Sequence, residues 1–346
     1  MRLFLPLLLI GSIGVNANAA DGSYDQCVLS AVSDTQSSET VSQIRTRCLA
    51  LSSTTDITAS SSIDSVEIVT PKKELGAMSN RIKAERKLQN NRFALIAHKQ
   101  NYILPVTHTS KINRAAYDFA DESFTDELRQ TEAKLQVSLK VPLNNDDIFL
   151  KNDGLYFGFT LKSWWQIYAN NISAPFRETN YQPEVFYVAG LDWHPMGGNT
   201  GFSVGIEHES NGRTQLLSRS WNRVYTSFLY EKDDFAFAFR PWYRFREDEK
   251  DDLSDTDGDD NPDIEKYMGH FDLTAAYSSG GHELTMLLRN NLRSDNKGAV
   301  ELGWSFPLFG NLKGYVQYFN GYGESLIDYN ISQERIGLGI LLTDKL

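Results

Sequence analysis

From about Asn101 to the C-terminus, apolar and polar residues alternate in short segments, and this alternation restricts the fold more than any other feature. Lys134-Leu135-Gln136-Val137-Ser138-Leu139 is one example. A period of two places successive side chains on opposite faces of an extended strand. Most segments are about ten residues long, the length of a tilted strand that crosses a membrane. Twelve segments fit: 101–109, 132–142, 154–166, 183–193, 200–209, 222–231, 235–246, 264–277, 282–291, 297–306, 311–322 and 335–343.

The connections between these segments alternate in length. Those after odd-numbered segments are often long: 110–131, 167–182, 210–221, 247–263 and 323–334. Those after even-numbered segments are mostly short: 194–199, 232–234, 278–281 and 307–310, with 143–153 as the exception. Bacterial barrels combine short periplasmic turns with longer extracellular loops and an even number of strands. The pattern therefore favours an all-β fold, a 12-stranded antiparallel transmembrane β-barrel over residues 101–346, rather than a soluble β fold.

The N-terminus carries the longest apolar run, from Leu3 to Val15, which follows Arg2 and leads into Ala17-Asn18-Ala19. This arrangement is typical of a secretory signal peptide, here residues 1–20. The run is too short to cross about 30 Å of hydrocarbon as a helix. No later segment offers about 18 consecutive apolar residues, so the sequence excludes a helical membrane protein.

Residues 21–100 differ from the rest and predict a periplasmic N-terminal extension, partly helical or disordered. They contain Ser/Thr-rich stretches and both cysteines, Cys27 and Cys48. Export permits a disulfide between these cysteines, and two free buried thiols are the alternative. The chain holds 45 acidic and 34 basic residues, and this net charge of −11 argues against nucleic acid as a partner.

Aromatic residues lie within or at the ends of the predicted strands, among them Trp164, Trp165, Trp193, Trp221 and Trp242. Membrane barrels place such residues in girdles at the two membrane–water interfaces. The alternative for each is an ordinary core aromatic. The chain ends in Leu346, whereas many outer-membrane barrels end in an aromatic residue.

His208 and Ser210 lie two residues apart at the end of one predicted strand. The period of two places them on the same face as Phe202, Val204 and Ile206, which is the face toward lipid. Polar residues in a lipid-facing row are costly without a purpose. A serine beside a histidine is the minimal activated nucleophile, because the imidazole takes the hydroxyl proton and returns it to the leaving group.

Asn222, on the next predicted strand, is a candidate for the group that orients the imidazole. A neutral amide can hold the ring but stabilises the imidazolium less than a carboxylate does. A His-x-Ser pattern alone is common, and an ordinary pair of polar residues at a strand end remains the alternative.

Several longer motifs surround these residues and continue beyond them. They are His208-Glu209-Ser210-Asn211-Gly212-Arg213, Ser218-Arg219-Ser220-Trp221-Asn222-Arg223, Lys162-Ser163-Trp164-Trp165-Gln166, Pro175-Phe176-Arg177-Glu178-Thr179-Asn180-Tyr181, Asp259-Asp260-Asn261-Pro262-Asp263 and Gly321-Tyr322-Gly323-Glu324-Ser325-Leu326-Ile327-Asp328-Tyr329-Asn330. In this order they resemble the bacterial outer-membrane phospholipase A family. The resemblance covers roughly residues 100–346, and the segment before about 95 shows no comparable match.

The resemblance implies a twelve-stranded barrel in the outer membrane that is active as a homodimer. It implies a calcium-dependent phospholipase that hydrolyses the sn-1 and sn-2 acyl esters of glycerophospholipids and lysophospholipids. Carried over by motif, Ser210 is the nucleophile, His208 the base and Asn222 the orienting residue. The Gly212 amide would help to form the oxyanion hole, together with water polarised by calcium.

The resemblance also implies a Ca²⁺ site between two subunits. Carbonyl oxygens of Arg213 and Ser218 would come from one subunit and the Ser173 hydroxyl from the other. Asp260 matches an acidic ligand associated with calcium in the monomeric state. Oxygen ligands of this kind suit Ca²⁺.

The chain departs from the family pattern at two positions. Gln215 stands where the family often has aspartate, which affects the monomer-state calcium site. Leu161 stands where a glutamine helps to hold the family's dimer, so that hydrogen bond cannot form here.

The acidic stretch 255–263 begins like a D-x-D-G-D calcium loop but lacks the spacing of an EF-hand. A solvated surface loop is the favoured interpretation, and additional divalent-ion binding is the alternative.

The sequence thus predicts a membrane-embedded serine hydrolase that degrades phospholipids in the outer leaflet and is activated when dimers form around calcium. Two other classes remain open. A non-catalytic outer-membrane barrel, such as a porin or adhesin, would be indifferent to Ser210→Ala. A soluble periplasmic esterase would fractionate without detergent.

Overall fold

The computed structural model describes residues 43–44, 46–48, 76–88, 95–117, 122–252, 255, 257–310 and 312–346. The expected signal peptide, most of the expected extension and Cys27 lie outside these residues. The chain divides into two units, 1–72 and 73–346. In the first unit, residues 43–44 and 46–48 are helical, and Cys48 is buried and disulfide-bonded.

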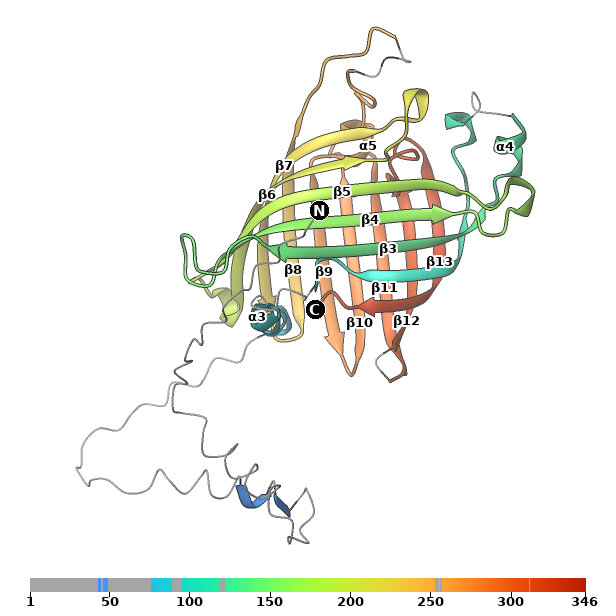
Figure 1. The fold of residues 1–346 in the computed structure, drawn as a ribbon. Helices are drawn as coiled ribbons and strands as arrows, with labels where there is room; N and C mark the ends of the chain where they lie inside the picture. Colours follow the sequence, from blue (N-terminus) through green and yellow to red (C-terminus); the bar gives the residue numbers. More distant parts are fainter. Residues whose placement is uncertain are drawn as a thin grey trace, which may run out of the picture. The chain divides into compact units, whose positions relative to one another are not determined.

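Twelve strands of the second unit form one closed antiparallel wall (Figure 1). They are β2 (Asn101–Thr109), β3 (Thr131–Pro142), β4 (Gly154–Trp165), β5 (Phe176–Leu191), β6 (Asn199–Ser210), β7 (Ser220–Lys232), β8 (Phe235–Phe245), β9 (Phe271–Ser279), β10 (His282–Asn290), β11 (Gly298–Phe309), β12 (Leu312–Tyr322) and β13 (Ser332–Thr343). Each strand pairs with its neighbours in the chain, and β13 pairs with β2 to close the ring. The short strand β1 (Ile96–Ala97) pairs with β3 beyond the end of β2. The predicted all-β fold of twelve antiparallel strands is confirmed.

The connections give the barrel two different ends. The long-loop end carries the connections 110–130, 166–175, 211–219, 246–270, 291–297 and 323–331, and the turn end carries 143–153, 192–198, 233–234, 280–281 and 310–311. The long-loop end holds the helices α4 (Glu122–Glu127) and α5 (Glu265–Met268) and the short 3₁₀ helices η1 (Arg114–Ala116), η2 (Asn170–Ile172) and η4 (Gln215–Leu217). The turn end holds η3 (Pro195–Gly197). Among the described helices, none is both long and apolar enough to cross a membrane.

The barrel wall is apolar outside and polar inside. In β6 the outward residues Val204 and Ile206 are exposed, whereas Ser203 and Glu207 face inward and are buried. Period-two alternation therefore sorts the side chains as expected, with the apolar row outside. This arrangement is the reverse of a soluble β fold, whose apolar residues face inward.

Paired charges fill the lumen toward the long-loop end. The fully buried Arg177 guanidinium bonds Glu132 at 3.0 Å and Asp328 at 2.9 Å. Glu324 accepts from Lys134 at 2.9 Å and from Arg335 at 2.7 Å. A buried charge without a partner is strongly destabilising, so these pairs depend on one another. They occupy the space that an open channel would need.

An apolar cluster covers the lumen at the same end. Ile264 and Met268 of the α5 turn and Leu326 of the 323–331 loop pack against the inward rings of Trp221 and Trp242. The sequence prediction of a strand over 264–277 is wrong in its first part, because residues 264 and 268 lie one turn apart on a helix and reach this cluster together. Strand β9 begins only at Phe271, after Gly269 ends the helix with φ +68°.

Two further predictions about the strands are corrected. The fourth predicted strand begins at Phe176 rather than at residue 183, because the inward polar residues of 176–182 are satisfied by partners across the lumen. The prediction of an aromatic girdle is wrong for three of the five tryptophans that it named, whereas Trp165 and Trp193 are 38% and 65% exposed, as an outward position requires. Trp164, Trp221 and Trp242 are 0%, 1% and 7% exposed and face the lumen. Trp221 Nε1 donates to Glu209 at 2.9 Å, whereas among the described residues Nε1 of Trp164 and of Trp242 is buried without a hydrogen-bond partner.

Helix α3 (Ala77–Leu88) lies at the turn end, although the sequence places it before the predicted barrel boundary at residue 101. The Ser79 amide donates to Glu231 on β7 at 2.9 Å. Arg81 donates to the carbonyls of Asp344 and Lys345 at 3.0 and 2.7 Å. These contacts join the helix to a barrel strand and to the C-terminal residues.

Candidate active site

The imidazole of His208 and the amide of Asn222 meet on the outer face of the barrel, near the long-loop end. The pairing of β6 with β7 sets His208 directly opposite Asn222. His208 Nδ1 lies 2.8 Å from Asn222 Oδ1. His208 is exposed and continues the outward row of Val204 and Ile206, as the sequence predicts. An imidazole held through Nδ1 leaves Nε2 available to another group.

Ser210 is the last residue of β6 and lies on the same outward row as His208. The Gly212 amide donates to Ser210 Oγ at 3.0 Å, so a backbone N–H lies directly beside the hydroxyl. Gly212 has φ +62°, and a Cβ at this position would lie 3.2 Å from the Tyr181 ring. Both observations explain why glycine is required at residue 212.

Asn211, which sequence reasoning missed, organises the loop 211–219. Its side chain is 3% exposed, its Oδ1 accepts from the amides of Arg213 and Arg219, and its Nδ2 donates to Leu217 O at 2.8 Å. One buried amide therefore fixes the loop that carries Gly212, Arg213 and Ser218. An Asn that follows a strand and precedes Gly is a turn signal that could have indicated this role.

Three of the four predicted calcium ligands lie on two loops that meet. Ser218 Oγ donates to Asp260 Oδ2 at 2.6 Å, and Arg213 lies on the same loop as Ser218. Ser173 follows η2 in the left-handed conformation with φ 60°, in the 166–175 connection at the same end of the barrel. No described contact joins Ser173 to the other three. The described residues contain no group of three or more His, Cys, Asp or Glu side chains that could hold a metal.

Two cationic side chains of the chain itself already contact these oxygens. Lys250 Nζ lies 2.6 Å from Asp260 Oδ1, and both side chains are less than 10% exposed. Arg219 Nη1 donates to Ser218 O at 2.6 Å. The oxygens thus attract positive charge in this conformation, and no sequence pattern indicated the contact of Lys250.

Glu247 is a further contact that sequence reasoning missed. Asn222 Nδ2 donates to Glu247 Oε1 at 2.9 Å. Glu247 follows β8 by two residues and is exposed to solvent. The amide of Asn222 therefore bridges an imidazole and a carboxylate.

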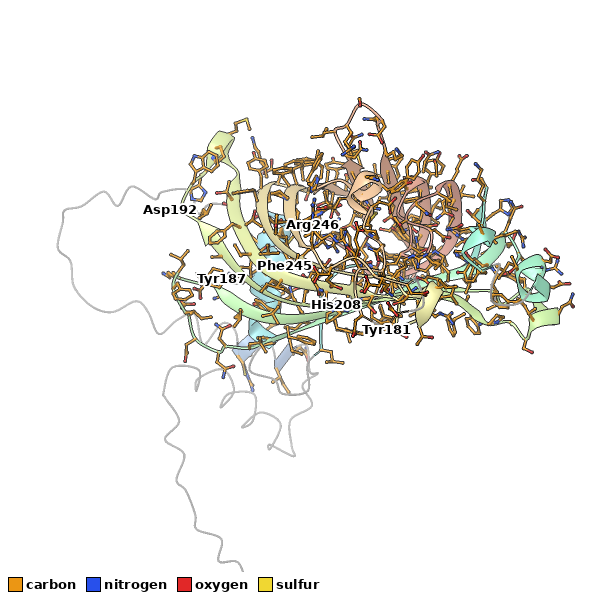
Figure 2. All side chains as sticks on the ribbon, turned by 90° about the horizontal axis from the view of Figure 1, so that it is seen from above. Tyr181, Tyr187, Asp192, His208, Phe245 and Arg246 are labelled. Carbon is orange, nitrogen blue, oxygen red and sulfur yellow. The ribbon has the colours of Figure 1, made fainter. Side chains whose placement is uncertain are left out.

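Aromatic side chains flank the exposed imidazole on the outer wall. Tyr181 of β5 pairs with Ser210, and Phe245 of β8 pairs with Asn222. Figure 2 shows His208 between Phe245 and Tyr181. Leu161 of β4 pairs with Tyr181 and extends this apolar surface away from the imidazole. The polar group is thus set in a surface suited to contact with lipid chains.

Comparison with known proteins assigns the chain to a family. The phospholipase A1 family model matches residues 78–342. Phospholipase A1 of Escherichia coli (strain K12) is 39% identical over 259 residues, covering 74% of this chain and 83% of that protein.

Solved structures agree with this match. Outer membrane phospholipase A from Escherichia coli has a TM-score of 0.69 at 37% identity, covering 76% of this chain and 97% of that one. The Salmonella typhi outer membrane phospholipase, solved as a dimer with bound calcium, has a TM-score of 0.68 at 37% identity, with the same coverage. The chain therefore belongs to the phospholipase A1 family, as a hydrolase that crosses the outer membrane through its twelve-stranded barrel.

Proposed function

We propose that this enzyme is a calcium-dependent phospholipase that hydrolyses the sn-1 and sn-2 acyl esters of glycerophospholipids and lysophospholipids at the lipid-facing wall of the barrel. The observation that carries the proposal is the outward placement of Ser210, His208 and Asn222 together, with His208 Nδ1 2.8 Å from Asn222 Oδ1. An ester at headgroup level can reach these groups without leaving the membrane.

Each catalytic residue has a distinct role. Asn222 Oδ1 accepts a hydrogen bond from the Nδ1–H of His208, which leaves Nε2 as the base for the Ser210 hydroxyl. Ser210 Oγ attacks the ester carbonyl carbon, and His208 returns the proton to the departing alcohol. A water then attacks the acyl-serine by the same route and releases the fatty acid.

The Gly212 amide stabilises the oxyanion. In the present conformation this amide donates to Ser210 Oγ at 3.0 Å. The donor therefore lies at hydrogen-bond distance from the attacking oxygen. As the new carbon–oxygen bond forms, the amide is placed to donate to the carbonyl oxygen instead. Loss of one such donor in other enzymes costs about 100- to 1,000-fold in rate.

The oxygens of Arg213, Ser218, Asp260 and, from a second copy, Ser173 are the proposed calcium ligands. The donor set fits, because hard oxygens suit Ca²⁺ and two of these oxygens already hold cationic side chains. Bound calcium would supply positive charge near the oxyanion. The Lys250 contact to Asp260 must open before that carboxylate can bind a metal. The calcium-bound dimer of the Salmonella typhi relative supports this proposal.

The active form is proposed to be a homodimer that forms along the outer wall of β3 to β5. Val137, Leu161 and Tyr181 form a row across these strands. Val137 and Tyr181 are exposed, so the row offers an apolar surface to a second copy. The long-loop end would face the cell surface, with the site at the outer leaflet, because barrels of this class carry their long loops outside.

The test compares the wild type with Ser210→Ala in detergent, with calcium and with chelator. Ser203→Ala is the matched control, because Ser203 lies on the same strand as Ser210 but faces the lumen. The proposal predicts calcium-dependent phospholipid turnover that Ser210→Ala abolishes and Ser203→Ala retains. Turnover that persists in Ser210→Ala would contradict the proposal and favour a barrel whose lipid-facing serine is not catalytic.

A further inference from the structure

We propose that Glu247 is a positioning residue that completes a relay of His208, Asn222 and Glu247 behind the nucleophile. The inference deepens the proposed function and rests on it, because a relay has meaning only if His208 is the base for Ser210. Its basis is a contact between the first residues of the 246–270 connection and the strand that carries Asn222.

The three side chains come from three successive elements. His208 lies on β6, Asn222 on β7, and Glu247 two residues beyond the end of β8. Asn222 pairs with His208 on one side and with Phe245 on the other. The Asn222 amide uses both of its ends, with Oδ1 2.8 Å from His208 Nδ1 and Nδ2 2.9 Å from Glu247 Oε1.

The carboxylate determines which end of the Asn222 amide faces the imidazole. An ionised carboxylate only accepts hydrogen bonds, so Glu247 can pair only with Nδ2. Oδ1 must then face His208, and an oxygen at this position requires a proton on Nδ1. Nε2 is left unprotonated, which is the state needed to take the Ser210 proton. Without Glu247, a half-turn of the amide would exchange its oxygen and nitrogen.

Glu247 also compensates for a weakness of asparagine in this position. A neutral amide stabilises the imidazolium that forms during attack less than an adjacent carboxylate does. Glu247 supplies a negative charge one side chain farther from the ring. Because Glu247 is exposed and water screens its charge, orientation of the amide is its larger contribution.

An exposed glutamate in an acidic loop is usually only a solvated residue. Here three acidic residues, Glu247, Asp248 and Glu249, follow Arg246 at the start of the loop. Within the described part of the chain, Glu247 is the one among them whose side chain contacts Asn222. Glu249 therefore provides a control with the same charge in the same loop.

The experiment uses Glu247→Ala, Glu247→Gln and Glu247→Lys in the refolded full chain, with Glu249→Lys as the control. Folding is checked by the heat-dependent electrophoretic mobility of the barrel, and kcat and KM are measured at saturating calcium. We expect Glu247→Ala to lower kcat about tenfold and leave KM within about twofold, as for loss of a charge-assisted hydrogen bond. Glu247→Gln retains a hydrogen-bond acceptor and should lower kcat only about threefold. Glu249→Lys should match the wild type.

Glu247→Lys replaces a hydrogen-bond acceptor by a donor, and we expect it to have the largest effect on kcat. A lysine only donates, so it would draw Oδ1 of Asn222 and turn Nδ2 toward the imidazole. We expect kcat to fall about 100-fold, because a wrong tautomer is costly in such enzymes. The nitrogen-15 shifts of the His208 ring, assigned by difference with His208→Gln, should move from a protonated Nδ1 to a protonated Nε2.

An unchanged kcat in Glu247→Ala and Glu247→Lys, or an equal loss in Glu249→Lys, would overturn the relay. So would a wild-type tautomer in the folded Glu247→Lys protein. Failure of the proposed function is distinguishable, because it would appear as turnover that survives Ser210→Ala. Turnover that Ser210→Ala abolishes but that the Glu247 variants retain would overturn the relay alone.

Discussion

At the scale of single residues, the proposed chemistry depends on polar side chains that continue an apolar row. Val204 and Ile206 are exposed on the outer wall, and His208 and Ser210 follow them at the same period. Two of the inward residues between them are charged, Glu207 and Glu209, and both are buried in the lumen. Register alone therefore decides that the serine meets lipid, because a slip by one residue would exchange the two rows.

Gly212 is the residue where backbone conformation and site geometry depend on each other most closely. We predict that Gly212→Ala loses about tenfold or more in kcat, because a Cβ with φ +62° is strained and would lie 3.2 Å from the Tyr181 ring. Gly280→Ala is the matched control, since Gly280 has φ +58° and open space around it. Both variants should lose about 1 kcal/mol or more of unfolding free energy. Equal activity of the two variants would contradict the role of Gly212.

At the scale of elements, the strands could be predicted from the sequence because a period of two is a local property. The prediction failed where distant contacts decide the structure. The α5 turn forms because Ile264 and Met268 reach the tryptophan cluster, and β5 extends to Phe176 because Arg177 finds Glu132 and Asp328 across the lumen. Neither set of distant contacts can be recognised from a local sequence pattern.

The candidate site also contains residues that the sequence predicts and residues that it does not predict. His208, Ser210 and Asn222 follow from strand register and from motif, so the sequence was sufficient to bring them together. Lys250 and Glu247 were missed, because their contacts depend on how an acidic loop folds back onto neighbouring strands. Motif comparison carries no information on such contacts unless the loop itself matches.

Lys250 gives a prediction for the acidic loop. Its ammonium lies 2.6 Å from Asp260, so calcium that uses this carboxylate must displace an internal cation. We predict that Lys250→Met lowers the calcium Kd by about three- to tenfold, consistent with loss of a partly buried ion pair. Isothermal titration of calcium into the detergent-solubilised barrel measures this directly. Lys266→Met, an exposed lysine at the same end, is the control, and an unchanged Kd in Lys250→Met would show that the contact does not compete with calcium.

At the scale of the whole molecule, the barrel is closed by its own side chains rather than built as a channel. Paired charges fill the lumen toward the long-loop end, and the apolar cluster of Trp221, Trp242, Ile264, Met268 and Leu326 covers them. The outer wall is thereby supported by a packed interior. A wall with a packed interior suits a site whose groups come from neighbouring strands.

The buried charges predict a sensitivity to acid. Burial alone would raise the pKa of Glu324, but the charges of Arg335 and Lys134 lower it to about 2. A lowered pKa in the folded state contributes stability that is present above about pH 4.5 and is lost as the pH falls toward 2. We expect the unfolding temperature to fall across this window, with a shallower fall in Glu324→Gln. An identical pH slope in the two proteins would contradict the role of Glu324.

The proposed dimer predicts that a single substitution in its interface strengthens dimerisation. Leu161 lies on the outer wall in the proposed dimer surface, where the family resemblance implies a glutamine, so Leu161→Gln should raise the fraction of dimer that calcium and a crosslinker trap. A hydrogen bond between membrane segments contributes about 0.6 kcal/mol on average, so the expected rise in the association constant is about threefold. Leu338→Gln, on the outer face of β13, is the control. An equal response of both variants would place the interface elsewhere.

The central claim is that the lipid-facing serine performs the chemistry, and covalent trapping tests it most directly. A long-chain alkyl sulfonyl fluoride is added to the barrel in phospholipid vesicles with calcium, and the modified peptide is identified by mass spectrometry. The account predicts a sulfonate ester on Ser210 Oγ, formed with release of fluoride, and loss of turnover in proportion to labelling. Full labelling of another residue, or turnover that persists while Ser210 is fully modified, would contradict the account.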